Sequence, residues 1–140
     1  MAKREVRHPD KAVATGAYSA GVLCDGWLYV SGQGPLDLKT GKVVGATIEE
    51  QTAVTLRNIE KILRAGGCTK ADVVKCACHL ADIRDFPRFN KAYAEFFGAG
   101  VLPARTTVQS GMSGILVEID AVARVPSLPR RRPGEPGAKP

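Results

Sequence analysis

Residues 47–80 read TIEEQTAVTLRNIEKILRAGGCTKADVVKCACHL and predict a helix followed directly by a strand. Thr47 can cap the helix, and Glu50, three residues later, completes a capping box. The apolar positions of the helix form one inward stripe, made of Val54, Leu56, Ile59, Ile62 and Leu63. Gly66-Gly67 ends the helix, because glycine tolerates the left-handed conformation. Residues 73–80 then form a strand with apolar side chains on both faces.

The residues before this unit predict a β-hairpin. In AGVLCDGWLYVSG, residues 20–32, two apolar runs flank Asp25-Gly26, and an Asp-Gly pair favours a type I′ turn. A loop with several glycines and a proline follows the hairpin, and we expect a short strand at residues 42–44.

The residues after the unit predict a second helix and two more strands. A helix capped by Asp85 runs to Phe97, and Gly98 ends it. Strands are expected at residues 105–109 and 115–124. The order hairpin, helix, strand, helix, strand, strand predicts an α+β domain in which two helices cover one face of a mixed sheet.

The last strand indicates that the other face of this sheet is neither fully exposed to solvent nor fully buried. One face of the strand carries Val117, Ile119, Ala121 and Ala123, and the other carries Leu116, Glu118, Asp120 and Val122. A mixed surface of this kind suits a subunit interface that holds a site.

Length and composition predict one folded domain, which we assign to residues 1–125. The apolar fraction of 44% and the charged fraction of 24% are typical of a soluble globular protein. No apolar run is long enough to span a membrane, and the N-terminus has no apolar segment of the secretory kind. We therefore expect a cytoplasmic protein without a membrane partner.

The net charge of +6 is concentrated at the C-terminus. From Arg124 onward, five basic residues oppose one acidic residue, a net of +4, which leaves about +2 for the remaining 123 residues. Residues 126–140 are rich in Pro and Gly and are expected to be a disordered tail. The tail is either simply solvated or binds an anionic partner. The low charge of the folded part argues against nucleic acid as a partner.

The four cysteines are expected to be reduced in a cytoplasmic chain; they are Cys24, Cys68, Cys76 and Cys78. Cys76 and Cys78 stand next to His79, which raises the alternative of a metal site. On a strand, however, the two cysteines share one face and His79 points to the other. The spacing also matches no common structural zinc signature, so buried thiols in a core strand are the favoured interpretation.

Three charged side chains near the closing strands could carry chemistry. Arg105 lies in VLPARTTVQ, residues 101–109, at the mouth of a strand, where its guanidinium could grip a carboxylate or phosphate. A structural salt bridge to Asp or Glu is the alternative. Glu118 and Asp120 share one strand face, and two neighbouring carboxylates can separate in pKa and supply a general base. The alternative for them is an exposed face of an antiparallel strand.

Two glycine-flanked segments add weaker candidates. GAYSAG, residues 16–21, presents the hydroxyl of Tyr18 on a large apolar ring. SGQG, residues 31–34, puts Ser31 and Gln33 in a bend whose glycines let backbone N–H groups approach a ligand closely. The chain contains no dinucleotide fingerprint, P-loop, H-E-x-x-H metal motif or G-x-S-x-G elbow.

Taken together, the motifs resemble the RidA/YjgF family, the reactive intermediate deaminases that act on enamines and imines. The segments that carry the resemblance occur in the family's order, and they are GAYSAGV, YVSGQGPLDLKTGKVV, IEEQTAVTLRNIEKILRAGG, VVKCACHLADIRDFPRFNKAYAEFF, LPARTTV and VEIDAVA. They cover residues 14–123. The resemblance implies a chorismate-mutase-like α+β fold, a homotrimer with active sites between subunits, and no cofactor or metal.

The implied reaction is the hydrolysis of 2-aminoacrylate and related 2-imino acids to 2-keto acids and ammonia, as metabolite damage control. The arginine of the family's P-A-R motif corresponds to Arg105, which is expected to grip the substrate carboxylate. Tyr18 is expected to line the pocket and orient the imine. Asp120 stands where the family has the second acid of its E-I-E motif, thought to position the hydrolytic water. The substrate-binding positions completing the implied site are Ser31, Gly32, Asn90, Thr107 and Glu118.

The chain departs from the family pattern at several positions. Asp120 is one methylene shorter than the usual glutamate, and Thr107 replaces a common cysteine. Ala17 and Ala20 stand where proline and glutamine are frequent. A shorter acid can slow the reaction by drawing the carboxylate back. The shorter acid keeps open the alternative of a small-carboxylate-binding or chaperone-like member without turnover. Two further alternatives are a specialised catabolic enamine deaminase and a ribonuclease or translation inhibitor.

Overall fold

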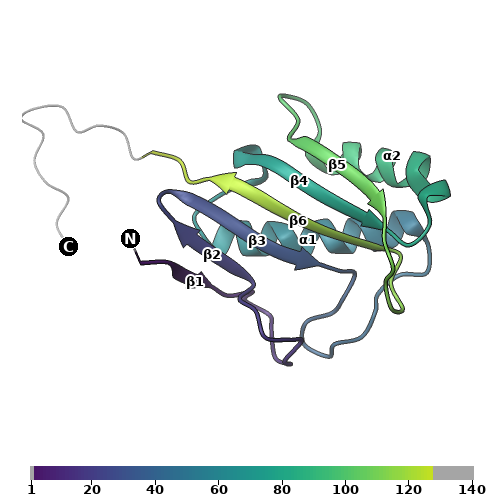
Figure 1. Cartoon of the computed structure of the whole chain (residues 1–140), viewed down its shortest axis with the longest axis horizontal. Helices are drawn as coiled ribbons and strands as arrows, with labels where there is room; N and C mark the ends of the chain where they lie inside the picture. The colour runs from purple at the N-terminus through teal and green to yellow at the C-terminus, as the bar shows by residue number, and fades with distance from the viewer. Residues whose placement is uncertain (1, 128–140) are drawn as a thin grey trace, which may run out of the picture.

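The computed structural model describes residues 2–127 and shows one six-stranded sheet with both helices on one side (Figure 1). The strands are β1 (Arg4–Val6), β2 (Gly21–Cys24), β3 (Trp27–Gln33), β4 (Val73–Leu80), β5 (Ala104–Gln109) and β6 (Val117–Arg124). The helices are α1 (Ile48–Ala65) and α2 (Phe86–Phe97). Two 3-10 turns lie between them in the chain: η1 (Lys70–Asp72) leads into β4, and η2 (Ile83–Asp85) leads into α2.

The strand order is β1-β2-β3-β6-β4-β5, in which β4 and β5 are parallel and the other neighbours are antiparallel. The predicted α+β fold, a mixed sheet with two helices on one face, is therefore confirmed. Residues 128–140, which make up most of the predicted tail, lie outside the described residues.

The hairpin of β2 and β3 turns at Asp25 and Gly26, as predicted. Both residues have positive φ, 54° and 79°, as a type I′ turn requires. Strand β1 was not predicted; it pairs with the outer edge of β2. Its three residues are too few to show the alternation by which a strand is predicted. A strand this short is stabilised mainly by its partner.

Helix α1 begins where predicted, with a modified cap. Thr47 Oγ1 accepts a hydrogen bond from the N–H of Glu50 at 3.2 Å. The Glu50 carboxylate accepts from the N–H of Ala46 at 2.9 Å, so the return bond of the predicted capping box is displaced by one residue. The helix start is thus stabilised by both side chains that the sequence indicated.

The buried side of α1 is wider than the predicted apolar stripe. Four of its members, Leu56, Ile59, Ile62 and Leu63, are at most 1% exposed. Val54 is only half-buried, whereas Thr52 and Thr55 are fully buried. The reason is that α1 packs against the sheet on one side and against α2 on another, so more than one stripe of the helix is covered.

Two local predictions were wrong. Residues 42–44 form no strand; Leu36 and Val43 make only an isolated bridge, because glycines with positive φ bend the chain on both sides. Asp85 stands at the N-cap position of α2 but makes no side-chain cap, since it is the last residue of a 3-10 turn with helical φ and ψ. Asp82 caps that turn instead.

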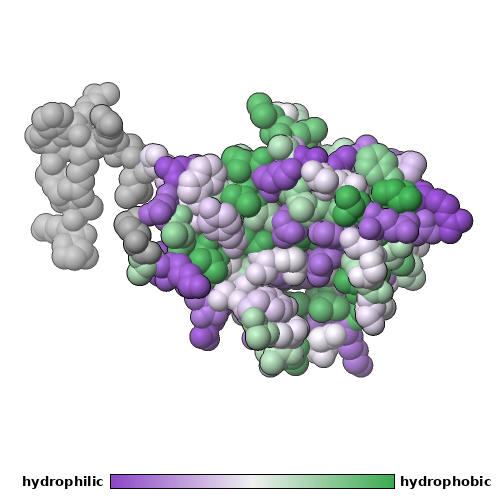
Figure 2. Space-filling model, viewed as in Figure 1, coloured by the Kyte–Doolittle hydropathy of each residue, from purple (hydrophilic) through white to green (hydrophobic). Residues whose placement is uncertain are grey.

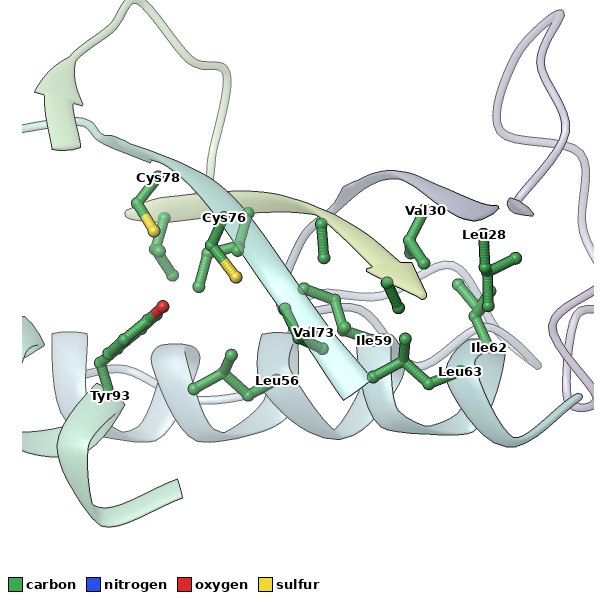
Figure 3. Close-up of a cluster of buried hydrophobic side chains, with 14 of the residues drawn as sticks. Leu28, Val30, Leu56, Ile59, Ile62, Leu63, Val73, Cys76, Cys78 and Tyr93 are labelled. Carbon is green, nitrogen blue, oxygen red and sulfur yellow. The ribbon is translucent and has the colours of Figure 1, made fainter. Parts of the chain in front are cut away.

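The core fills the space between the sheet and the helices, where α1 side chains meet those of β3 and β4 (Figure 3). Strand β6 contributes alternate residues to it, namely Val117, Ile119, Ala121 and Ala123. Glu118, Asp120 and Val122 point the other way and are half-buried. The two faces predicted for this strand are therefore the observed ones.

The face of the sheet turned away from the helices is called here the open face. It carries Tyr29 and Val108, which are 48% and 42% exposed, together with Glu118 and Asp120. Figure 2 shows hydrophobic and hydrophilic residues interspersed on the side of the molecule that includes it. Within residues 2–127, no helix combines the length and the hydropathy that crossing a bilayer requires.

Candidate functional site

Arg105 is the second residue of the edge strand β5, and its side chain lies on the helix side of the sheet. The register pairs it with Cys76 of β4, which is buried in the core. The guanidinium carbon stands over three rings of α2, at 5.4 Å from the centroid of Phe86, 5.7 Å from Phe89 and 4.7 Å from Tyr93. Cation–π contacts attract a guanidinium through its charge, and its five N–H groups still need oxygen acceptors.

The surroundings of Arg105 favour an anion site over a structural salt bridge. The ion pairs found within residues 2–127 all join other residues. A cavity of about 300 Å³ opens beside the guanidinium and is lined by Asn90, Tyr93, Ala94, Leu102, Pro103 and Arg105. The structure thus brings Arg105 and Asn90 together and leaves the N–H edge of the arginine available to a carboxylate.

Thr107 lies two residues beyond Arg105 on the same face of β5. In register it stands beside Cys78 of β4. Its hydroxyl oxygen is buried and has no hydrogen-bond partner within the described residues. The side chain of Thr107 therefore faces the helix side of the sheet, does not line the cavity beside Arg105 and is not an exposed donor.

The cysteines of β4, Cys76 and Cys78, lie among the buried side chains of the core (Figure 3). Burial raises the pKa of the Cys78 thiol to about 12, and burial also raises the pKa of Cys76. The hydroxyl of Tyr93 points toward these cysteines, and its burial raises the pKa of Tyr93 as well. Because the thiolate is the nucleophilic form, these cysteines are not nucleophiles at neutral pH.

We expect a thiol reagent at neutral pH to modify one cysteine in the folded protein and all four after unfolding. Cys24 is only partly buried, whereas the other three are buried. The measurement is an absorbance titration with an aromatic disulfide, with and without denaturant. Cys24→Ser is the matched control and should remove the fast reaction. Rapid modification of a second thiol in the native protein would contradict the burial of β4.

The metal interpretation of the cysteine segment has no support in the described part of the chain. His79 points to the open face, away from the thiols, and its Nδ1 lies 2.8 Å from the Ser110 hydroxyl. Across residues 2–127, no group of three or more His, Cys, Asp or Glu side chains is arranged to hold a metal ion.

A second group of predicted residues lines a smaller cavity, called here the open-side cavity. Its volume is about 150 Å³, and it brings Tyr18, Gly32 and Glu118 together with Lys11 on the wall. The Tyr18 hydroxyl shares a hydrogen bond of 2.5 Å with Thr15 Oγ1. Lys11 Nζ lies 5.0 Å from the centroid of the Tyr18 ring. The tyrosine is therefore held at its hydroxyl and at its ring face.

Gly32 allows strand β3 to approach Glu118 closely. A β-carbon at this position would lie 3.0 Å from Cδ of Glu118, a contact that side chains avoid. Ser31, one residue before, ties β3 to the segment that carries Tyr18, since its hydroxyl donates to the Ser19 carbonyl at 2.6 Å. The proton of Ser31 is thereby used by the backbone, and only its oxygen lone pairs remain for a ligand.

The two cavities belong to opposite faces of the sheet. Asp120 pairs with Ala77, and Glu118 pairs with His79, so both acids lie on the open face. Arg105 lies on the helix face, and β4 separates its strand from β6. One chain therefore does not bring Arg105 and Asp120 into a single site.

Sequence reasoning missed four side chains that contact the predicted site residues Arg105 and Tyr18. Phe86, Phe89 and Tyr93 recur at helical spacing, which signals a buried face of α2, but the strand that they meet depends on the fold. Lys11 lies in a segment without periodicity, so no pattern signals its contact with the Tyr18 ring.

Comparison with known proteins identifies the family. Residues 9–125 match the family described as endoribonuclease L-PSP, which is the RidA/YjgF family. The chain belongs to this family. Among its RidA/YjgF relatives, a RutC family protein from Saccharolobus solfataricus is 45% identical over 111 residues, which covers 78% of this chain and 87% of the relative.

Other members of the RidA/YjgF family agree with this assignment. The 2-iminobutanoate/2-iminopropanoate deaminase of Rattus norvegicus is 42% identical over 123 residues, or 86% of this chain and 89% of the relative. A solved structure of a Rid family protein of unknown function from Yersinia pestis is 36% identical, with a TM-score of 0.82. The match covers 89% of this chain and 100% of the Yersinia pestis chain. The fold of the chain is thus that of Rid proteins.

Proposed function

We propose that this RidA/YjgF member hydrolyses reactive 2-imino acids, including the imine form of 2-aminoacrylate, to 2-keto acids and ammonia. The observation that carries the proposal is the guanidinium of Arg105. It is held over three aromatic rings beside a cavity of about 300 Å³, and no acid of residues 2–127 pairs with it. Every 2-imino acid carries a carboxylate that this group can bind. Similarity to the rat deaminase supports the same activity.

The proposed active site forms between the subunits of a homotrimer. Each chain carries two half-sites on opposite faces of its sheet, the Arg105 cavity and the open-side cavity. In a closed ring, one half-site of each chain can meet the other half-site of its neighbour. The exposed Tyr29 and Val108 supply apolar area for such an interface. A monomeric mass by light scattering would count against this arrangement.

In the proposed reaction, Arg105 binds the substrate carboxylate and Asn90 lies beside it. Asp120, or Glu118 next to it, orients a water molecule onto the C=N carbon, with Tyr18 along the pocket wall. The acid takes a proton from this water as the water oxygen bonds to the carbon; the C=N electron pair moves to nitrogen, which receives that proton. In the resulting carbinolamine, the hydroxyl proton passes through the same acid to nitrogen while the C–N bond breaks, so that the C=O bond forms and ammonia leaves. The reaction is intrinsically easy, so orientation supplies most of the rate.

A panel of imines tests the activity. A flavin amino-acid oxidase generates each 2-imino acid in situ, and semicarbazide captures what is not hydrolysed. We expect the protein to lower the yield of semicarbazone for small 2-imino acids, as an established deaminase does in the same assay. Unchanged yields over the whole panel would reject the proposed activity.

Asp120→Glu is expected to preserve or raise kcat/KM for 2-aminoacrylate. The longer side chain extends the carboxylate by roughly one C–C bond, about 1.5 Å, and errors of about 1 Å can cost about a hundredfold in rate. Asp120→Asn is the control of matched size, and it should lower kcat/KM by at least about tenfold because it cannot accept a proton. A large loss in Asp120→Glu would show that the site is built around the shorter acid.

The shorter Asp120 favours one second candidate, a member that binds small carboxylates without turnover. Binding of a 2-keto acid measured by calorimetry, together with no turnover in the imine panel, would establish that alternative. A specialised catabolic enamine deaminase would instead show turnover confined to one substrate of the panel.

A further inference from the structure

A buried histidine anchors the N-terminal strap, defined as residues 8–12. His8 is 3% exposed, and Asn58 of α1, its partner, is 7% exposed. The Nε2 atom of His8 lies 3.0 Å from Asn58 Oδ1, and its Nδ1 accepts the N–H of Asp10 at 3.0 Å. Since Nδ1 is an acceptor here, Nε2 carries the ring proton and donates it to Asn58. The neutral imidazole thus has a partner at both nitrogens.

Asn58 connects this anchor to the wall of the open-side cavity. Its Nδ2 donates to the carbonyl of Gly34 at 3.1 Å and to the carbonyl of Leu36 at 2.9 Å. Both of these loop residues line the cavity. One amide side chain therefore holds the histidine on one side and the loop on the other.

The strap itself also forms part of the cavity. The N–H of Ala12 donates to the carbonyl of Leu38 at 3.0 Å, which joins the strap to the same loop. Lys11 lines the cavity and stands over the ring of Tyr18. Movement of the strap would therefore displace a cation and a loop contact from the cavity wall.

We propose that His8 is a positioning residue that holds Lys11 and the loop of residues 34–38 in the cavity wall, and that protonation of its imidazole releases the strap. The proposal rests on the proposed function, because the open-side cavity is half of the proposed site. An imidazolium carries a proton on both nitrogens, so its Nδ1–H would face the N–H of Asp10, donor against donor. A buried donor without an acceptor is costly, and outward movement of the strap relieves the conflict.

The electrostatic surroundings favour the neutral form of His8. Burial lowers the pKa of His8 below its ordinary value of 6.5, against the opposing effect of the hydrogen bond with Asn58. The charged groups that face His8 or share the adjoining cavity of about 340 Å³ are Asp10, Lys11, Lys61, Glu5 and Arg7. Asp10 raises the pKa of His8, and Lys61, which pairs with Asp10, lowers it.

The direction of the pH effect follows from that lowered pKa. The unfolded chain binds the His8 proton more readily than the folded chain does. The contribution of His8 to the free energy of unfolding is therefore complete above pH 6.5 and declines as the pH falls below this value. We expect the strap to be released in the same acidic pH range.

The test follows three signals while the pH falls from about 8 to about 5, the range in which histidines titrate. The chain has two histidines, so the ring resonances of His8 can be distinguished by NMR from those of His79. The other signals are hydrogen exchange at the amides of Asp10 and Ala12, and KM for an imine substrate. We expect both amides to lose protection and KM to rise about fivefold as His8 is protonated, as for the loss of one hydrogen bond.

His8→Gln is the matched variant, because its side-chain amide can donate to Asn58 and cannot gain a charge. Its KM should stay constant over this pH range and remain within about twofold of the wild-type value at high pH. Asp10→Asn removes the ion pair with Lys61 and keeps the backbone N–H, so it should retain the loss of protection on acidification, with the midpoint moved to lower pH because the charge that raises the pKa of His8 is gone.

Two results would overturn the proposal: the wild-type pH response persists in His8→Gln, or the Asp10 amide stays protected after His8 has titrated. A wild-type protein that turns over no imine at any pH would reject the proposed function separately. In that case the exchange data alone decide whether His8 holds the strap.

Discussion

Replacing Arg105 by alanine is expected to abolish the turnover of 2-aminoacrylate generated in situ, with kcat/KM lower by about a hundredfold or more. Among the residues that line its cavity, Arg105 alone carries a positive charge that can form an ion pair with a substrate carboxylate. Its loss leaves the substrate anion beside the apolar rings of Phe86, Phe89 and Tyr93. The measurement is the rate of keto-acid formation under conditions that trap unreacted imine.

Arg124→Ala is the matched control for this change. Arg124 also stands over an aromatic ring, 5.1 Å from the centroid of Trp27, and it donates to the carbonyl of Asp25 at 2.9 Å. It lines neither of the two candidate cavities. It should therefore lose comparable stacking without losing activity. Full activity of Arg105→Ala would reject the carboxylate-binding role on which the proposed function depends.

Gly32→Ala should lower kcat/KM by about a hundredfold while leaving the free energy of unfolding nearly unchanged. The added β-carbon would lie 3.0 Å from Cδ and 3.3 Å from Oε1 of Glu118. These atoms are the far end of a flexible side chain, so the carboxylate moves while the strand stays in place. Steady-state kinetics and urea unfolding measure the two effects.

Gly111→Ala is the control for adding a methyl group at a glycine. A β-carbon there would meet nothing within 4 Å, so both activity and stability should match the wild type. Normal kinetics in Gly32→Ala would show that the reaction does not use the position of the Glu118 carboxylate.

Mixing the two inactive variants tests whether their half-sites meet between subunits. Arg105→Ala retains an intact open-side cavity, and Gly32→Ala retains an intact arginine cavity. After unfolding and refolding together in equal amounts, random assembly gives about a quarter of sites with both halves intact. Activity near that fraction is expected in the mixture. Activity no higher than that of the separate variants would contradict a site in which these two halves meet between subunits.

The order of elements could be predicted because its signals are local. The Asp25-Gly26 turn, the Thr47 cap and the alternation along residues 117–124 depend on backbone preference and on side-chain period. Strand β1 and the isolated bridge at Val43 could not be predicted in the same way, because each is defined by its partner more than by its own residues.

The sequence by itself determined which strands carry the candidate catalytic and binding side chains, with Arg105 on one strand and Glu118 and Asp120 on another. It also placed the two acids on one face of their strand. Only the tertiary structure decided that Arg105 and the two acids lie on opposite faces of the sheet and that Arg105 and Glu118 line different cavities. Strand β4 lies between β5 and β6, and the register turns Arg105 toward α2 and both acids to the open face. The physical reason is that alternation along a strand specifies two faces, whereas pairing and helix packing decide which face is covered.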